Sequence, residues 1–314
     1  MGKGENIGEC ALCRKKDIKL MQSHIIPKAI YKRTKEYENS RFRNFYEPKS
    51  IYQDGEKKPM LCHGCEEFFS RYETMFSNLF LDKYLSSINS PLPKITESIE
   101  LYMLTVAWRI LYDDLYVYHS FSGEDVRKNF EEYEEKLGKF LYERYLEENP
   151  GEVNTRTSVY EPNIEGKSFC EMIAEIERWE KSSSPEDMSE IKNYIYKISD
   201  LGFNDSVTEL FDSMIFGYSF YDSTRTKYYI ISGYKGLILA TVYLRKRNVL
   251  ITDDKKLLRK TRKAEKIIKE DIIEEVNYIL LKIKRKYPEV QKKLDENGLR
   301  AKISKRYEGK QKIK

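Results

Sequence analysis

The chain has 314 residues, of which 56 are Lys or Arg and 51 are Asp or Glu, giving a net charge of +5. This length allows more than one domain, each with its own core. Because the sequence holds no apolar run of eighteen residues and starts with Met-Gly-Lys-Gly-Glu rather than an apolar leader, we expect a cytoplasmic protein with no membrane partner.

The charge is distributed unevenly along the chain. Residues 1–60 carry a net charge of +6, residues 61–243 carry −14 and residues 244–314 carry +13. A polyanion such as a nucleic acid would be attracted to both ends and repelled by the middle. The alternative is that the basic ends pack against the acidic middle of the same chain, or of a second subunit in a homo-oligomer.

Four of the five cysteines form two Cys-x-x-Cys pairs, Cys10 with Cys13 and Cys62 with Cys65. This spacing lets one tight turn present two thiolates to a single ion, and two such pairs complete a tetrahedral zinc site. We therefore expect one structural Zn²⁺ that stabilises a small N-terminal module. With four thiolates the site is closed, so this zinc would take no part in catalysis. His63 is interpreted as a solvent-facing residue rather than an alternative ligand.

The region around the cysteines mixes short strands and helices. Residues 17–26 are rich in apolar and β-branched residues and predict a strand that ends near His24, where Pro27 limits the backbone. Residues 29–37 predict a short helix, and the turn-rich residues 39–58 predict a loop and a hairpin. After Cys65 the apolar residues recur every three or four positions, which predicts a helix from about residue 66 to 85.

The rest of the chain predicts helices, then a sheet, then a helix. Residues 99–118 predict a buried helix in which Arg109 pairs with a carboxylate. Further helices are expected at 126–148, 169–180 and 186–198. Strand-forming composition at 211–221, 227–232 and 236–243 predicts a small antiparallel meander. A long helix with basic ends is expected at 254–286.

These elements predict an α+β protein with three domains: a zinc module at 1–88, a helical domain at 89–200, and a small antiparallel sheet with basic C-terminal helices at 201–314.

The order of elements in the zinc module is that of a treble-clef zinc motif, in which a cysteine turn (a zinc knuckle) is followed by a hairpin and by a helix that carries the last ligand. With Ser-His-Ile-Ile-Pro-Lys at 23–28 and Leu-Cys-x-x-Cys-Glu at 61–66, the first 75 residues resemble the HNH (ββα-metal) endonucleases. The longer string, with Phe-Ser-x-Tyr-Glu at 69–73, also resembles bacterial proteins described as HNH-like.

The resemblance implies a metal-dependent nuclease that acts on DNA rather than RNA, in bacterial defence against phage and with a defence-system protein as a partner. In these nucleases a strand histidine is the general base, and the residue before it and a helix histidine or asparagine hold a catalytic divalent ion. His24 matches the base. Ser23 stands in place of the usual Asp, and Glu66 in place of the helix ligand. Glu66 would hold Mg²⁺ or Mn²⁺, with Asp54, Glu67 or Glu73 as helpers.

The departure at Ser23 leaves a second interpretation open. His24 would then be a structural histidine, and the module a catalytically inactive zinc scaffold. Such a scaffold would bind nucleic acid or a partner protein, and the sheet at 211–243 would recognise a ligand.

Two groups of basic residues are candidates for contacts with nucleic acid. Tyr, Lys and Arg interleave between residues 31 and 46, a composition that suits stacking on bases and neutralising phosphates. The basic start of the 254–286 helix would add attraction without taking part in the reaction. The candidates are Lys28, Lys32, Arg33, Arg41, Arg43, Arg259, Lys260, Arg262 and Lys263.

Overall fold

The structure is a computed structural model that describes residues 6–38, 42–44, 51–52, 55–88, 90–117, 121, 123–156, 190–212, 214–244, 254–286 and 288. For residues 34–38, 42–44, 51–52 and 254–264 the description covers the backbone only.

The head of the molecule consists of a three-stranded antiparallel sheet and the helices that follow its strands. Its strand order is β1 (Ile7–Gly8), β2 (Ile18–His24), β5 (Lys57–Cys62). As predicted, β2 ends at His24, and α1 (Lys28–Glu38) begins shortly after it. β5 leads directly into α2 (His63–Phe76). A π-helical segment, η1 (Ser77–Leu81), and α3 (Asp82–Ser86) extend α2, which confirms a helical run to about residue 85.

A six-stranded sheet forms the centre of the body. Its order is β4 (Ile51–Tyr52), β3 (Phe42–Asn44), β7 (Met214–Tyr221), β8 (Lys227–Tyr234), β9 (Leu237–Leu244), β6 (Ile191–Lys197). The predicted meander is confirmed as β7–β8–β9, and β3 and β4 pair as a hairpin. All neighbours are antiparallel except β3 and β7, which are parallel.

The prediction of a helix at 186–198 was wrong for residues 191–197, which form strand β6 paired along its whole length with β9. Its side chains alternate between the two faces of the sheet. Ile191 and Ile195 pack into one core, whereas Tyr194 and Tyr196 pack into the other. This period of two and the β-branched and aromatic composition are those of a strand. The helix predicted at 169–180 lies outside the described residues.

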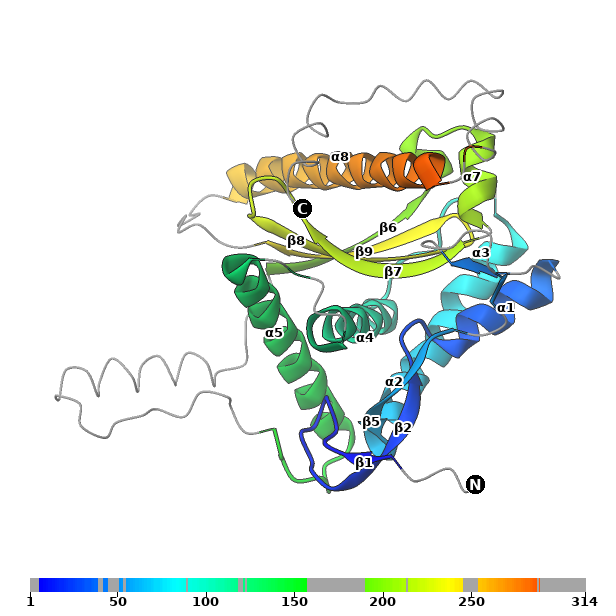
Figure 1. Ribbon diagram of the computed structural model, residues 1–314. Coiled ribbons are helices and arrows are strands. Elements are labelled where there is room, and N and C mark those ends of the chain that lie inside the picture. The colour runs from blue at the N-terminus through cyan, green and yellow to red at the C-terminus, as the bar shows by residue number, and fades with distance from the viewer. Residues whose placement is uncertain are drawn as a thin grey trace.

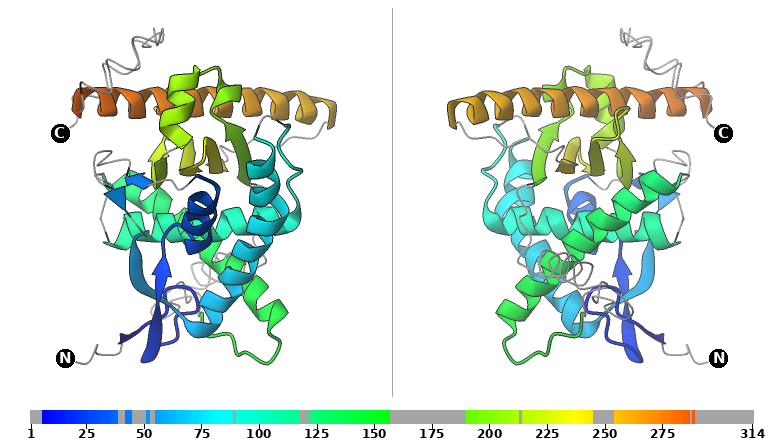
Figure 2. Two further views of the ribbon diagram at one scale, coloured as in Figure 1. Left: turned by 90° about the vertical axis from the view of Figure 1, so that its right-hand side faces the viewer. Right: turned by 90° about the vertical axis from the view of Figure 1, so that its left-hand side faces the viewer.

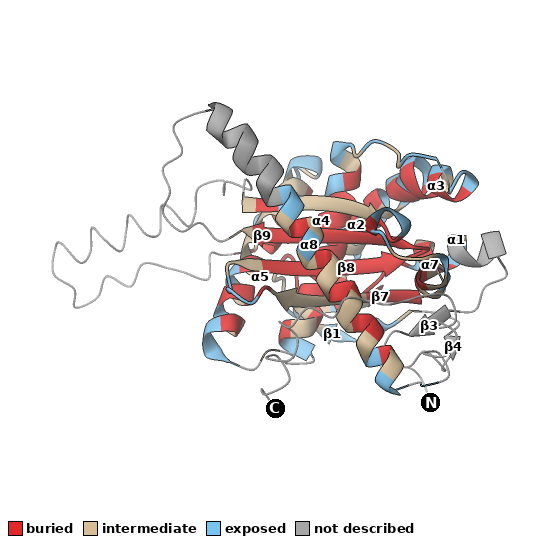
Figure 3. Ribbon diagram, turned by 90° about the horizontal axis from the view of Figure 1, so that it is seen from above, coloured by how far each residue is buried: buried red, intermediate tan, exposed pale blue. Residues whose placement is uncertain are grey.

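Helices cover both faces of the six-stranded sheet (Figure 1). On one face lie α4 (Glu97–Tyr112), its π-helical extension η2 (Asp113–Val117) and α5 (Glu124–Glu148). On the other face lie α7 (Asp205–Asp212) and α8 (Asp254–Lys286), with the short 3₁₀ helix η4 (Ser199–Leu201) preceding α7. The two side views in Figure 2 agree with this layering, and Figure 3 shows α8 crossing above buried strands.

Strand alternation divides the apolar side chains into two cores. In β8, Tyr228 and Ile230 face the core shared with α4 and α5, and Tyr229 and Ile231 face the core shared with α8. The first core extends from Cys10 in the head to Tyr243 in β9 and so includes residues of all three predicted domains. Their boundaries at 88 and 200 stay a prediction. Within the described ranges, no helix has both the length and the apolar character that crossing a bilayer requires.

Candidate metal centre

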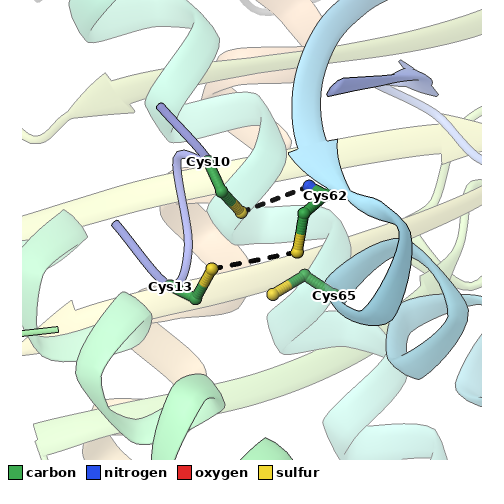
Figure 4. A group of neighbouring side chains, drawn as sticks. All are labelled: Cys10, Cys13, Cys62 and Cys65. Carbon is green, nitrogen blue, oxygen red and sulfur yellow. Dashed lines mark hydrogen bonds between the residues drawn. The ribbon is translucent and has the colours of Figure 1, made fainter. Parts of the chain in front are cut away.

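The two cysteine pairs converge on one point (Figure 4). The sulfur atoms of Cys10, Cys13, Cys62 and Cys65 all lie within 4.8 Å of one another. Cys13 Sγ and Cys62 Sγ are 3.8 Å apart. A zinc–sulfur bond of about 2.3 Å implies a separation of about 3.8 Å between sulfurs in a tetrahedral site. The cluster therefore has the size and donor set for one Zn²⁺, as predicted from the spacing.

The first pair sits in a tight turn that is attached to strand β5. The backbone N–H of Arg14 donates to the carbonyl of Cys10 at 2.9 Å, and Arg14 has a left-handed φ of 61°. The N–H of Ala11 donates to the carbonyl of Met60 at 2.9 Å. These bonds hold the turn next to the strand that ends at Cys62.

The second pair lies where β5 becomes α2. Cys62 is the residue that precedes the helix, and its N–H donates to Cys10 Sγ at 3.3 Å. Cys65 is fully buried in the first helical turn. The positive end of a helix dipole favours a thiolate at this position. His63 is exposed, in agreement with its interpretation as a solvent-facing residue.

Burial makes a cation necessary for the ionised form of this cluster. Cys10, Cys13 and Cys65 are at most 1% exposed. Thiolates this close together repel one another, and the repulsion is stronger away from water. A divalent ion at the centre removes it, so the donor set fits Zn²⁺ on its chemistry as well as on its geometry.

Ser23 and His24 are the last two residues of β2, where they pair with the start of β5. Ser23 is fully buried, and its hydroxyl donates to Glu66 Oε2 on α2 at 2.6 Å. His24 is the last residue of β2 and is half-buried. The structure thus brings the residue before His24 into contact with the residue after the last cysteine.

A buried arginine completes this network. Arg109, on α4, donates from Nη1 to Glu73 Oε1 at 2.6 Å, and its Nη2 lies 3.7 Å from Glu66 Oε1. The prediction that Arg109 pairs with a carboxylate in a buried helix is confirmed. The sequence contains no signal for which carboxylates these are. Glu66 and Glu73 share a helix face because they are two turns apart, but Arg109 comes from a different helix.

Three carboxylates were predicted to assist Glu66 in binding a divalent ion, and the structure treats each differently. Glu73 is bonded to Arg109, Glu67 is exposed on α2, and Asp54 lies outside the described residues. In the part of the chain that the structure describes, the four cysteines form the one group of three or more Cys, His, Asp or Glu side chains close enough to bind a metal ion together. A Mg²⁺ or Mn²⁺ ion at Glu66 would thus need water and a substrate phosphate to complete its coordination, as is usual for Mg²⁺.

The predicted nucleic-acid contacts are described only in part. Lys28 and Lys32 are exposed on α1, whereas Arg33 Nε pairs with Asp82 Oδ1 at 3.1 Å. Arg41 lies outside the described residues, and for Arg43 in β3 and for Arg259, Lys260, Arg262 and Lys263 in α8 the backbone alone is described. The roles of these residues stay predictions.

Residues 149–156 follow α5 and form a segment that we call the strap. The strap binds the first cysteine turn, a contact that the sequence did not predict. Thr155 Oγ1 donates to the carbonyl of Cys13 at 2.7 Å, and Arg156 Nη1 donates to that of Leu12 at 2.9 Å. Arg156 Nη2 also donates to Glu135 Oε2 on α5 at 2.8 Å. A Cβ at Gly138 would lie 2.6 Å from the guanidinium of Arg156, so any other residue there would displace this end of the Arg156 side chain. Residues more than 140 positions apart leave no local sequence pattern from which to predict such contacts.

No protein-family model, no curated protein and no solved structure matches this chain. The resemblance to HNH endonucleases therefore rests on the residues of the head alone.

Proposed function

We propose that the head is a treble-clef module held by one Zn²⁺ and that it acts as an HNH-like, metal-dependent endonuclease on DNA. The observation that carries the proposal is the 2.6 Å hydrogen bond from Ser23 Oγ to Glu66 Oε2. In the nucleases that the sequence resembles, the residue before the base and a residue of the following helix hold the same ion. Here the corresponding two side chains touch, beside a strand that ends at a half-buried histidine.

In this proposal His24 is the general base. It takes a proton from a water molecule whose oxygen bonds to phosphorus while the bond from phosphorus to a sugar oxygen breaks, and that sugar oxygen takes up a proton from solvent. Histidine suits this work because the ordinary pKa of its side chain is close to neutral. Glu66 would hold Mg²⁺ or Mn²⁺, and such an ion would stabilise negative charge on phosphate oxygens. A role in bacterial defence against phage, in the cytoplasm and with a partner protein of that system, belongs to the same proposal.

Cleavage of plasmid or oligonucleotide DNA with Mg²⁺ or Mn²⁺ tests the mechanism. Loss of a general base lowers a rate by about 10²- to 10⁴-fold, so we expect His24→Ala to cut DNA slower by that factor. His63→Ala is the matched control, because His63 belongs to the same module and is exposed. It should cut like the parent, and both variants should retain zinc. Parental cleavage by His24→Ala would refute the assigned base.

A second candidate function has its own support. The guanidinium of Arg109 lies 3.7 Å from Glu66, and this positive charge opposes a divalent ion at the same carboxylate. A catalytically inactive zinc module that binds nucleic acid or a partner protein is consistent with this arrangement. Salt-sensitive DNA binding without cleavage, under any divalent metal, would favour the second candidate over the first.

A further inference from the structure

His24 and Lys57 are opposite each other on the paired strands β2 and β5. The N–H of Ile25 donates to the carbonyl of Glu56 at 3.1 Å, and these two residues are the next pair along the ribbon. Hydrogen-bonded and non-hydrogen-bonded pairs alternate in an antiparallel ladder, so His24 and Lys57 form a non-hydrogen-bonded pair. The side chains of such a pair leave the ribbon on the same side, with Cβ atoms about 4.5–5.5 Å apart. The histidine that we propose as the base therefore has a lysine as its cross-strand neighbour.

The two successive lysines of β5 have different surroundings. Lys58 is half-buried, and its ammonium contacts Asp113 of η2 as well as Glu56, the latter at 3.2 Å. Lys57 is exposed. The carboxylates of Glu56 and Asp113 thus compensate the charge of Lys58, and the charge of Lys57 lies at the surface beside His24.

The chain that follows His24 adds positive charge to the same part of the head. Helix α1 begins at Lys28, only four residues after the end of β2, and both Lys28 and Lys32 are exposed. Four residues span at most about 14 Å, so these lysines begin within that distance of His24. A lysine ammonium is a common partner of phosphate oxygens. This surface therefore suits a phosphate group better than a cation.

We propose that Lys57 and His24 form a binding site for one phosphodiester group of a nucleic acid. The ammonium of Lys57 neutralises a non-bridging oxygen and holds the phosphorus next to the imidazole of His24. The inference rests on the proposed function for the role of His24 as the base, and it names the cation of the chain itself that binds the phosphate under attack. Binding at this pair needs no divalent ion.

Nuclear magnetic resonance of the histidine rings tests the site without reference to cleavage, because the chain has three histidines. The probe is dimethyl phosphate, a small phosphodiester with one negative charge. It is added to the full, zinc-loaded chain at fixed pH and ionic strength, with no Mg²⁺ or Mn²⁺. The ring signal of His24, identified by its loss in His24→Ala, should shift with the probe, whereas the signal of the exposed His63 should not.

Variants of Lys57 separate a specific contact from general attraction. Lys57→Gln should weaken the binding of dimethyl phosphate at His24 roughly tenfold, because a hydrogen bond to a charged group is lost. Lys57→Arg keeps the charge and should retain most of the affinity. Lys16→Gln removes the same charge from another exposed lysine of the head and should bind the probe like the parent. Zinc content and melting temperature show that each variant is folded.

The possible results distinguish this inference from the proposed function. If dimethyl phosphate leaves the His24 signal unchanged, or if Lys57→Gln and Lys16→Gln bind it equally well, the phosphate site is refuted, and the role of His24 as the base still depends on cleavage by His24→Ala. If Lys57→Gln weakens binding as expected but His24→Ala cuts DNA at the parental rate, the phosphate site stands and the base assignment fails.

Discussion

At the scale of single residues, Asp114 combines burial with a specific hydrogen bond. It lies in η2, and its Oδ2 accepts the backbone N–H of Ser219 in β7 at 2.7 Å. Burial, opposed by the hydrogen bonds from Ser219, raises the pKa of Asp114 from 3.8 to about 6. The folded state thus favours the protonated form. The stability that this gives is fully present below pH 3.8 and is lost as the pH rises through about 6.

We expect Asp114→Asn to stabilise the protein above pH 6. Asparagine keeps a carbonyl oxygen for the N–H of Ser219 and has no charge to bury, so the gain should be on the order of 1–2 kcal/mol. Denaturant unfolding of parent and variant at pH 4 and pH 8 measures it, and the difference should appear only at the higher pH. Asp125→Asn, at an exposed aspartate of α5, is the control. An equal shift at both pH values would contradict the assignment.

At the scale of elements, the strap at residues 149–156 links the cysteine cluster to α5. Besides its bonds to the first cysteine turn, the strap is tied back to the helix by Tyr142, whose hydroxyl donates to the carbonyl of Val153 at 3.1 Å. The acceptors at Leu12 and Cys13 keep their positions only while their turn is held in shape. Because structural zinc contributes folding free energy on the order of 10 kcal/mol, loss of the ion should release the turn and the strap together.

Hydrogen–deuterium exchange with and without a zinc chelator tests this coupling. We expect faster exchange at residues 10–15 and at the strap after chelation, whereas α8, which packs on the far face of the sheet, should stay protected. Cys170 is the one cysteine of the sequence that belongs to neither Cys-x-x-Cys pair, so we expect Cys170→Ser to leave both zinc content and exchange at the parental level. Unchanged exchange at the strap after zinc is removed would show that the clasp is independent of the metal.

The elements also differ in how well the sequence predicted them. Residues with a strong local pattern were predicted well: the cysteine spacing indicated the cluster, and helical periodicity indicated α2, α4, α5 and the backbone course of α8. The strand β6 (Ile191–Lys197) was not predicted because the run is short and its local composition also suits a helix. Its strand conformation depends on pairing with β9, which is distant in the sequence. The contacts of Ser23, Glu66 and Arg109 depend on the packing of three elements, which no single stretch of sequence encodes.

At the scale of the whole molecule, α8 packs on the body sheet through one apolar face. The residues of α8 that are buried against the sheet are Ile268, Ile272, Val276, Ile279, Leu280 and Ile283. These residues recur three or four positions apart, so they lie on one side of the helix. The +13 net charge of residues 244–314 is more than a solvated helix needs, so we expect this region to assist binding to a polyanion rather than the reaction.

Replacing Arg259, Lys260, Arg262 and Lys263 with Gln should weaken DNA binding and flatten its salt dependence, by about one unit of log–log slope for each phosphate that is no longer neutralised. Fluorescence anisotropy at several salt concentrations measures both quantities. Zinc content should not change, because the cluster lies in the head. If affinity and slope keep their parental values, the basic region serves another purpose, most simply pairing with the acidic middle of its own chain or of a second subunit.

The strand pair β3–β7 couples the unfolding of the head to the unfolding of the body. The segment between the two cysteine pairs leaves the head and adds β3 to the body sheet, where Arg43 and Asn44 pair in parallel with Met214 and Ile215. A zinc ion on Cys13 and Cys62 would close a loop between residues that are 49 positions apart. This loop contains β3, which is hydrogen-bonded to β7 in the body sheet. Cross-linking a loop of that size removes conformational freedom from the unfolded chain. Head and body should therefore unfold as one cooperative unit, and the head could not be grafted onto another protein without the strand that it lends.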